Sequence, residues 1–595
     1  MLKIDLIIRI TFEKARMVSW CIDSFITIDT AWNQVYKSKE LFYYPQFISL
    51  MQINFSLPRK TLARDVECLL NIKLMQIVVN KDDDMLNINW LLYGLSICLI
   101  LTNVVFANST HNLIIQSDIK HDVSFPLRFT YLKPSIQHKP LLPPSLLMPV
   151  HSSVVIELTG FKGLGVDLGG LQITSLQPDP VASVGMLQYV QWVNNYIGVF
   201  NKTNGALLSG FPKAGNALWS GFGGLCETHN VGLTTIKYDQ LAGRWVFSQH
   251  AYADAVNGPF YECIAVSTSE DATGSYYRYA FSLPALTNYA RFGLWPDAYY
   301  MAFNLQGNNV NGAFACAFDR NQMIAGAAST MQCKSVSDMQ PNPITPIDLE
   351  GVMLPETGQP AYFMGLLPPL NLLITQFHVD FSNPTNTKVT TDNLQVRLYA
   401  KSCPQSNGKA CAIQPNINNN LDVYSDRLMH RLVYRQFSNY GSVLATHTIV
   451  GSLPEKAPAI RWYELRLLPD ADNFMPVVYQ QGNINPDSMN RFLGSITMDK
   501  NANIAVGYSL TSSLIYPSLE FGTHLITDPL NTMTIQALAT GLGSQLTGSA
   551  WGNVSNISID PVDDCTYWYM GEYILRSGTL NWSTVIVQFK LAGCT

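Results

Sequence analysis

Charged residues are scarce in this chain of 595 residues, since Asp, Glu, Lys and Arg together make up only 14% of it. The formal net charge is -5, and the sequence has no basic stripe and no RNA-binding aromatic motif. We therefore predict no nucleic-acid partner, because phosphate binding needs clustered Lys and Arg. With 47% hydrophobic and 11% aromatic residues, the chain can form a globular domain rather than a disordered one.

Familiar catalytic and metal-binding signatures are also missing. The sequence contains no H-E-x-x-H, no C-x-x-C and no histidine pair at metal-ligand spacing, so we predict no metal and no cofactor. The nearest approach to a nucleophile elbow, Gly507–Thr511, lacks the final glycine. The glycine-rich stretch Gly160–Gly170 lacks a P-loop lysine and is interpreted as a flexible turn. No residue is predicted to be catalytic.

An apolar segment lies inside the chain, at residues 85–107. Trp90–Leu101 reads WLLYGLSICLIL, and the following TNVVFA ends in Ala107 with Val105 two positions earlier, the pattern of a cleaved signal peptide. Met85–Asn89 carries no basic residue, and two other interpretations stay open. Trp90–Ala107 is also long enough for a membrane anchor, which takes about 17–25 residues. The other interpretation is that the start of the chain is wrongly assigned and that Met85 is the true start. Otherwise residues 1–84 are a translated N-terminal extension.

We expect a secreted, periplasmic or cell-surface protein, and the cysteine count agrees with export. Three of the 11 cysteines precede the predicted cleavage point and eight follow it. An even number in an exported chain predicts disulfides. Spacing leaves the pairing open. The simplest scheme joins neighbours, Cys226–Cys263, Cys316–Cys333, Cys403–Cys411 and Cys565–Cys594, and the alternative is eight buried free thiols.

The remaining chain divides into a linker and a strand-rich region. We expect residues 108–150 to be a linker, because residues 133–150 contain five prolines, which discourage helices and central strands. From 151 to 595, short runs rich in Val, Ile, Tyr, Phe and Trp alternate with turn residues. The best helical pattern, Asp426–Arg435, is short. Such a succession of short strands predicts an all-β sandwich, barrel or propeller.

A repeated pattern favours the propeller. An acidic turn residue, a few small or polar residues and an aromatic-rich strand recur roughly every 60 to 70 residues. A unit of that length can hold a four-stranded blade. We therefore predict an all-β fold with a β-propeller over residues 151–595, with seven blades favoured and six or eight as alternatives. The acidic residues of the repeat are Asp179, Asp239, Asp297, Glu356, Asp426, Asp499 and Asp560.

These acids have two interpretations. A turn Asp accepts hydrogen bonds from backbone N–H groups two residues later, which fixes the turn. Alternatively, acids around a propeller axis bind a cation or polar ligand. A second group, Arg461, Trp462 and Glu464, alternates charged with aromatic residues along an expected strand. If exposed, these side chains would stack on sugars or bind a protein, and if buried they would pack in the core. The candidates for ligand binding are Asp179, Asp239, Asp297, Asp499, Asp560, Arg461, Trp462 and Glu464.

Several segments resemble a family of exported, mostly bacterial, propeller-like proteins of unassigned chemistry. In its opening segment the family has Pro-Asp, Val-Gly, a Gln-x-Val-Asn strand and a turn of the form Phe-Asn/Asp-Lys-x-x-Gly. The matching residues in this chain are Pro178-Asp179, Val184-Gly185, Gln191–Asn194 and Phe200–Gly205, and later matches are Tyr238–Trp245, Leu294–Tyr300, Arg461–Glu464 and Ile559–Trp568. The resemblance covers about residues 170–595 and implies a propeller fold and export, without an activity.

Two functions from different classes are compatible with these features. We favour an exported, non-catalytic propeller that presents a binding face to an extracellular protein or glycan, with a membrane as partner only if Trp90–Ala107 is retained as an anchor. The alternative is an extracellular glycoside hydrolase or sialidase-like enzyme, which needs two carboxylates about 5–10 Å apart. Converging carboxylates in a deep axial pocket favour the enzyme. A shallow face with exposed aromatic residues favours the binding protein.

Overall fold

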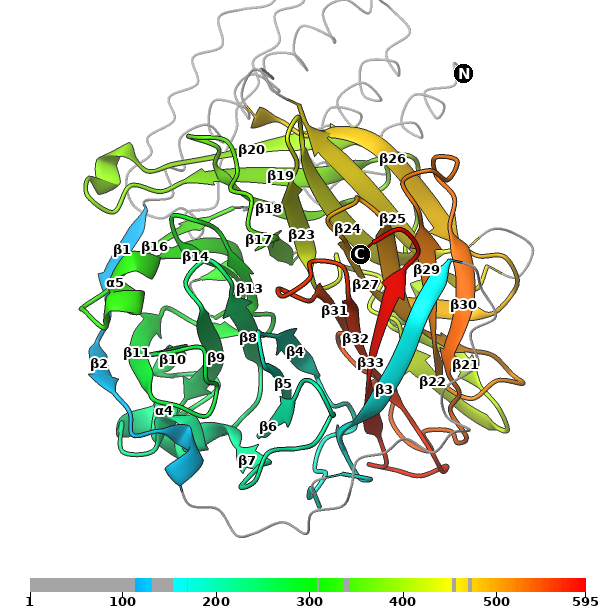
Figure 1. The fold of residues 1–595 in the computed structure, drawn as a ribbon, viewed down its shortest axis with the longest axis horizontal. Coiled ribbons are helices and arrows are strands. Elements are labelled where there is room, and N and C mark those ends of the chain that lie inside the picture. Colours follow the sequence, from blue (N-terminus) through cyan, green and yellow to red (C-terminus); the bar gives the residue numbers. More distant parts are fainter. Residues whose placement is uncertain are drawn as a thin grey trace, which may run out of the picture. The chain divides into compact units, whose positions relative to one another are not determined.

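The computed structural model describes residues 113–130, 154–168, 170–307, 310–336, 343–451, 456–468 and 474–594. His111–Thr595 belong to one compact region, in which almost all elements are strands (Figure 1). The segments predicted as N-terminal extension and as signal or anchor lie outside the described residues, as does the proline-rich stretch 133–150. Among the described residues, no helix is long and apolar enough to cross a membrane.

Seven successive four-stranded antiparallel units can be traced in the described residues, each beginning with its innermost strand. Units 1 to 3 occupy the first half of the ring. Unit 1 has β4 (Val181–Val184), β5 (Gln188–Val193), β6 (Tyr196–Asn201) and β7 (Lys213–Ala214); unit 2 has β8 (Thr234–Asp239), β9 (Arg244–Tyr252), β10 (Phe260–Ser267) and β11 (Tyr276–Leu283); unit 3 has β12 (Leu286–Thr287) and β13 (Arg291–Leu294) on one edge, then β14 (Tyr299–Gln306), β15 (Asn311–Phe318) and β16 (Thr330–Ser335).

Units 4 to 7 follow the same plan. Unit 4 has β17 (Ile344–Glu350), β18 (Ala361–Leu367), β19 (Asn371–His378) and β20 (Lys388–Gln395); unit 5 has β23 (Leu432–Gln436), β24 (Gly441–Val450), β25 (Pro458–Leu467) and β26 (Val477–Ile484); unit 6 has β27 (Asn490–Met498), β28 (Ile504–Thr511), β29 (Ser518–His524) and β30 (Thr534–Ala539); unit 7 has β31 (Asn556–Ile559), β32 (Tyr567–Tyr573), β33 (Ser583–Leu591) and, from earlier in the chain, β3 (Val155–Gly165). Because β17 also pairs in parallel with β23, units 4 and 5 form one continuous sheet.

The innermost strands form a closed ring. Each lies against the next, in the order β4, β8, β13, β17, β23, β27 and β31, and β31 lies against β4. The described region is therefore a β-propeller, which confirms the predicted fold class. The ring is closed by β3, which pairs with β33 and so completes the last unit with a strand from the beginning of the region (Figure 1).

Three features differ from the sequence predictions. The glycine-rich stretch interpreted as a flexible turn begins inside β3, whose Phe161 and Leu164 are buried. The short helical pattern at Asp426–Arg435 contains a turn and then β23, because neighbouring sheets bury both faces of that segment. The expected linker contributes two strands, β1 (Ile114–Ser117) and β2 (Lys120–Val123), which pair with the outer strands β16 and β11. The prolines that suggested a linker come only after these strands.

The remaining elements are short. They are the 3₁₀ helices η1 (Leu127–Phe129), η2 (Gly215–Trp219), η3 (Pro384–Asn386) and η4 (Pro404–Ser406), the helices α4 (Gly224–Thr228) and α5 (Arg320–Ala325), and the hairpin strands β21 (Ala410–Gln414) and β22 (Ile417–Asp422).

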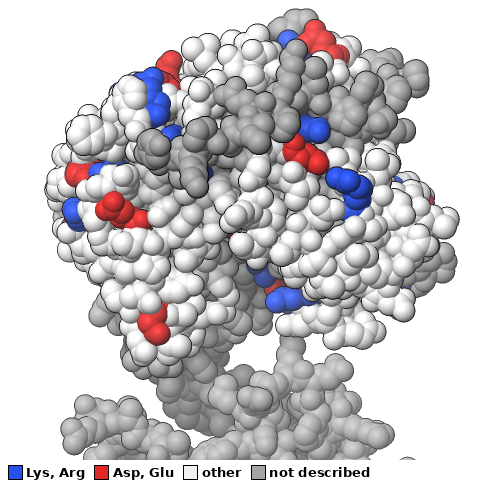
Figure 2. Space-filling model, turned by 90° about the horizontal axis from the view of Figure 1, so that it is seen from below, with Lys and Arg blue, Asp and Glu red and all other residues white. Residues whose placement is uncertain are grey.

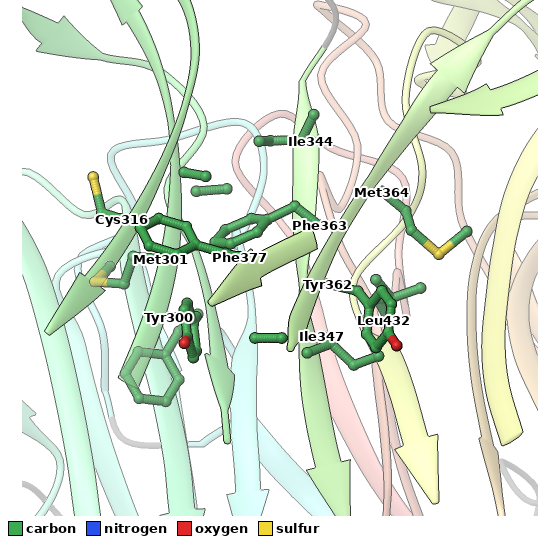
Figure 3. Close-up of a cluster of buried hydrophobic side chains, with 14 of the residues drawn as sticks. Tyr300, Met301, Cys316, Ile344, Ile347, Tyr362, Phe363, Met364, Phe377 and Leu432 are labelled. Atoms are coloured by element: carbon green, nitrogen blue, oxygen red, sulfur yellow. The ribbon is translucent and has the colours of Figure 1, made fainter. Parts of the chain in front are cut away.

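The core lies between the faces of neighbouring units, which explains why strands such as β28 are buried along their whole length. Figure 3 shows one such contact, where Tyr300 of β14 meets Phe363 of β18 and Phe377 of β19 at ring-centroid distances of 5.8 and 5.6 Å. Edge-on aromatic packing of this kind adds about 0.5–1.5 kcal/mol per pair beyond the area that it buries. The four predicted neighbour disulfides are all present, each within this core or at its rim.

Candidate functional site

Most of the repeated acids lie in one kind of turn, between the first and second strands of a unit. Asp239 ends β8 and accepts hydrogen bonds from the backbone amides of Leu241 and Ala242, both at 3.1 Å. It also pairs with Arg320 at 2.7 Å and with the hydroxyl of Tyr299 at 2.8 Å. All its oxygens are therefore used inside the fold. This arrangement supports the turn interpretation of the repeat.

Asp499 and Asp560 take the corresponding positions in units 6 and 7. Asp499 accepts hydrogen bonds from the backbone amides of Asn501 and Asn503, at 2.9 and 3.0 Å. Asp560 pairs with Lys202 at 2.9 Å and accepts a hydrogen bond from the indole of Trp568 at 3.0 Å. Both carboxylates thus fasten turns or neighbouring units, and neither has an open coordination side. No group of three or more metal-ligating side chains occurs in the described part of the chain.

Asp297 occupies the same turn in unit 3 but is less well satisfied. Its Oδ2 accepts a 3.3 Å hydrogen bond from Tyr300, and its Oδ1 is buried without a partner. Burial is the main cause that raises the pKa of Asp297 to about 6, although the Tyr300 hydroxyl opposes the shift. An unfolded Asp has a pKa of about 3.9. The folded protein therefore binds more protons than the unfolded chain between these two values.

This shift predicts a pH dependence of stability. The free energy of unfolding contributed by Asp297 is highest below about pH 4 and falls as the pH rises to about 6, because the buried carboxyl must ionise. We expect Asp297→Asn to be about 1–3 kcal/mol more stable than the wild type at pH 7 and similar to it at pH 4. Urea unfolding at the two pH values measures the difference, with the exposed Asp392→Asn as control. An unchanged pH slope in Asp297→Asn would contradict the assignment.

Asp179 and Asp426 lie at the opposite end of their units, before the first strand rather than after it. Asp179 precedes β4 by two residues, and Asp426 precedes β23. The turn between the first two strands is formed by other residues in these units, Gly185–Leu187 in unit 1 and Phe437–Tyr440 in unit 5. The apparent repeat thus combined two positions that the fold separates, because spacing along the chain does not distinguish the two ends of a strand.

The three candidates on β25 are buried between sheets. Trp462 has no exposed surface, and Arg461 and Glu464 are also buried. The guanidinium of Arg461 donates to the carbonyls of Arg397 and Leu398, at 3.2 and 3.3 Å. Glu464 pairs with Arg466 at 2.9 Å. Of the two interpretations given for these residues, the structure therefore agrees with the buried one, and they do not form an exposed sugar- or protein-binding surface.

The propeller axis is filled by paired ions. Lys237 of β8 lies 2.8 Å from Asp348 of β17, and Arg431, directly before β23, pairs with both Asp348 and Glu350. All four side chains are buried. The Arg431 and Lys237 charges hold the pKa values of Asp348 and Glu350 below their usual range despite burial. We refer to Lys237, Asp348, Glu350 and Arg431 as the axial ion cluster.

Hydrogen bonds connect the axial ion cluster to most of the ring. Asp348 accepts from the amide of Leu294 in β13, and Glu350 accepts from the hydroxyl of Thr497 in β27 and, at 2.8 Å, from the amide of Ile559 in β31. Arg431 donates to the carbonyl of Ile557 at 3.0 Å. The cluster thus joins the innermost strands of units 2 to 7. The cluster is balanced, with two positive and two negative side chains that are all buried.

Four polar residues stand where innermost strands begin, at one end of the axis. Asp179 lies before β4, Arg291 starts β13, His430 lies before β23 and Asn553 lies before β31. We call this group the axial mouth. Asn553 donates a 2.6 Å hydrogen bond to Asp179. Burial raises the pKa of Asp179 and, with the charges of Arg291 and Arg431, lowers the pKa of His430 well below its usual value.

A second carboxyl group lies near the same segment. Glu572 of β32 is buried and accepts a 2.6 Å hydrogen bond from the amide of Gly552, the residue before Asn553. Its other oxygen has no partner, and burial raises its pKa well above the usual value. Asp179 and Glu572 therefore accept hydrogen bonds from two adjacent residues, Asn553 and Gly552. Four further acids, Glu227, Asp297, Glu464 and Asp564, lie in separate parts of the ring.

An open cavity lies away from the axis, where β2 and η1 meet unit 2 and the loop after β7. Its volume is about 260 Å³. Arg278 of β11 joins its walls, because it pairs with Asp122 of β2 at 2.7 Å and donates to the carbonyl of Ser220 at 2.9 Å. The lining residues are Ser124, Phe125, Leu127, Phe129, Thr130, Ala217, Leu218, Ser220 and Arg278.

The rim of this cavity is aromatic. Phe125 is 85% exposed and Phe129 is 75% exposed, whereas the only other exposed aromatic side chain in the described residues is Tyr479, at 38%. The segment that carries both phenylalanines is held in place by Leu127, which is buried in the core of units 1 and 2. Ser124, Thr130 and Ser220 line the same cavity. Because these residues fall in the expected linker, they were not among the predicted site residues.

No protein-family model and no curated protein sequence matches the chain. Solved structures with similar folds include the WD40 domain of SCAP from fission yeast, with 8% identity, 79% of this chain and 98% of that chain covered, and a TM-score of 0.31. A polysaccharide lyase family 25 ulvan lyase has 10% identity, coverage of 73% and 91%, and a TM-score of 0.29.

A third similar structure is the catalytic domain of a family GH62 α-L-arabinofuranosidase from Coprinopsis cinerea, with 12% identity, coverage of 61% and 91%, and a TM-score of 0.25. At these values none of the three gives this chain a family or an activity. The chain is a β-propeller protein with four disulfides, and the family resemblance seen in its sequence stays a prediction.

Proposed function

We propose that the protein is an exported, non-catalytic β-propeller that binds a glycan in the cavity beside β2 and η1. The observation that carries this proposal is the position of the exposed aromatic residues. Two of the three in the described region, Phe125 and Phe129, line one cavity. Phe, Tyr and Trp side chains dominate the energetics of interfaces, and neighbouring exposed apolar side chains around a cavity are typical of an interaction site.

The chemistry of the cavity suits a sugar. A sugar ring has apolar C–H faces that pack on an aromatic ring, and hydroxyl groups that exchange hydrogen bonds with polar side chains. Both occur in the cavity, because Ser220 lines it together with the two phenylalanines. The hydroxyls of Ser124 and Thr130, which also line it, already donate to the carbonyls of Phe125 and Leu127 at 2.8 Å. Figure 2 shows that charged side chains are few and scattered on the face seen from below Figure 1. Recognition by packing and neutral hydrogen bonds therefore fits this protein better than charge attraction.

Export is supported by the four disulfides. Disulfides form and persist in oxidising compartments and are rare in the reducing cytosol. The bonds lie in units 2, 3 and 7 and in the loop before β21, so they stabilise separate parts of the ring. Secretion to the cell surface or beyond would place the cavity where extracellular glycans occur.

The test compares wild type with Phe125→Ala/Phe129→Ala on a glycan array, followed by calorimetry with the best ligand. We expect the double variant to bind at least about tenfold more weakly, because each lost aromatic contact typically costs more than 1 kcal/mol. Tyr479→Ala, which removes the third exposed aromatic residue, on β26 of unit 5, should bind as the wild type does. Wild-type binding that survives the double substitution would place the glycan elsewhere. Binding to no glycan on the array would contradict the proposal.

One observation favours an enzyme as the second candidate. Asp179 and Glu572 are two buried carboxyls whose pKa values are raised by burial. They accept hydrogen bonds from the adjacent residues Asn553 and Gly552. A carboxyl whose pKa is raised by burial, as that of Glu572 is, is suited to act as a general acid in glycoside hydrolysis. Hydrolysis of any bound glycan should therefore be monitored in parallel. Turnover that is lost in Glu572→Gln, with binding retained, would replace the binding proposal by a glycosidase.

A further inference from the structure

Arg291 differs from the other buried arginines in its hydrogen bonding. Its Nη1 donates to the carbonyl of Ala290 at 2.8 Å, and its Nε and Nη2 have no partner. Nε and Nη2 form one edge of the guanidinium, the edge that can donate two parallel hydrogen bonds to a single carboxylate. Arg291 is 4% exposed. A buried guanidinium with an unused edge costs several kcal/mol unless a partner is supplied.

The other buried arginines all have hydrogen-bonding or ionic partners for their guanidinium groups. Seven arginines are buried in the described part of the chain. Five form an ion pair with an Asp or Glu, and Arg461 donates from three nitrogens to an amide and two carbonyls. Arg291 has neither arrangement. The five paired residues are Arg278, Arg320, Arg431, Arg435 and Arg491.

The surroundings of Arg291 contain further polar groups with unused capacity. Its charge influences the pKa values of Asp179 and His430, and all three residues lie at or just before the start of an innermost strand, at the same end of the axis. Asp179 uses one oxygen for Asn553, and it does not form an ion pair with Arg291. His430, Asp179 and Asn553 are each 7–8% exposed, so the axial mouth is largely buried and only small areas of these side chains contact solvent. Segments of three other units thus bring polar groups to the end of the axis at which Arg291 lies.

We propose that the axial mouth is a second binding site, separate from the cavity, in which the Nε–Nη2 edge of Arg291 binds the carboxylate of a small organic acid. The two oxygens of a carboxylate match the two parallel N–H groups of this edge. The amide of Asn553 and the imidazole of His430 supply additional hydrogen bonds. The axial ion cluster closes the axis behind the site, so that the ligand enters and leaves through the mouth.

Arg427 provides a matched control for this site. Its guanidinium lies 4.8 Å from the ring centroid of Tyr289, and that of Arg291 lies 3.9 Å from the same centroid. Arg427, however, already pairs with Asp426 at 2.8 Å. The two arginines therefore share one aromatic neighbour and differ in whether a carboxylate is already present. Replacing each arginine by lysine keeps the positive charge and removes the pair of parallel N–H donors.

The test measures the rise in melting temperature on titration with sodium acetate at constant ionic strength, using acetamide as the neutral probe of similar shape. We expect a saturable rise with acetate and none with acetamide. In Arg291→Lys the apparent affinity should fall about tenfold or more, since hydrogen bonds to a charged group are lost, whereas Arg427→Lys should retain it. Asp179→Asn, which removes the negative charge facing the ligand, should bind acetate more tightly than the wild type.

Several results would overturn the proposal. They are the absence of a saturable effect of acetate on the wild type, an equal effect of acetamide, and an equal loss of affinity in Arg291→Lys and Arg427→Lys. If Arg291→Lys does not fold, the Asp179→Asn variant decides, because unchanged or weaker acetate binding in it would exclude a ligand carboxylate beside Arg291. Retained glycan binding in all these variants would leave the cavity proposal intact while this one fails.

Discussion

Replacing Asp348 with alanine is expected to lower the free energy of unfolding by about 3–5 kcal/mol, because the substitution leaves buried cations without their partner. Asp348 lies between Lys237 and Arg431, and all three are buried at the axis. Without the carboxylate, only Glu350 remains to balance two positive charges. The same substitution at the exposed Asp392 should change stability by less than about 0.5 kcal/mol.

A double variant separates lost pairing from lost packing. Lys237→Met removes one of the two cations, and in the Asp348→Ala background it should recover part of the stability, because one less charge is left unbalanced. Chemical unfolding followed by fluorescence gives all the values needed. If Asp348→Ala costs less than about 1 kcal/mol, or if the two substitutions are simply additive, the axial ion cluster does not hold the ring together as described.

Replacing Trp568 with alanine is expected to cost about 3–5 kcal/mol, since Trp568 packs across the contact that closes the ring. Its side chain is buried in a cluster formed by units 1 and 7. The ring centroids of Tyr189 and Phe161 lie 5.3 and 6.3 Å away. The indole also donates to Asp560 at 3.0 Å, so the substitution leaves a buried carboxylate with one donor fewer.

The conservative substitution Trp568→Phe tests the packing argument. Phenylalanine keeps an aromatic ring but loses the N–H group and part of the apolar volume, so it should cost about 1–2 kcal/mol. Phe125→Ala is the control, because it removes an aromatic side chain outside the closing contact. It should leave the free energy of unfolding nearly unchanged, since Phe125 is exposed. Equal effects of the two Trp568 substitutions would mean that the hydrogen bond to Asp560, rather than packing, dominates.

The fold class could be predicted from sequence because it depends on local patterns. Short β-rich runs, turn residues and the period of the repeat all reflect neighbours along the chain, and Asp239, Asp499 and Asp560 do lie in the turns that the pattern suggested. Neighbour pairing of the cysteines succeeded for a related reason. Consecutive strands of one unit are close in space, so that cysteines close in sequence meet, as do Cys316 and Cys333 on β15 and β16.

The structural features that could not be predicted from the sequence depend on contacts between segments that are distant along the chain. The closing strand β3 pairs with β33 from the far end of the chain, and its glycines gave it the appearance of a turn. The axial ion cluster assembles four side chains from three units, and no spacing along the chain reveals that they meet. Strands β1 and β2 and the rim residues Phe125 and Phe129 were missed because the prolines that follow them dominated the interpretation of that segment.

Glycan binding between Phe125 and Phe129 is tested most directly by a crystal structure of the protein with the glycan that binds best. We expect sugar density in the cavity, with a ring packed on at least one of the two phenylalanines and hydroxyl groups near Ser220 or Thr130. Sugar bound at the axial mouth beside Asp179 and Glu572, with the cavity empty, would contradict the proposed function.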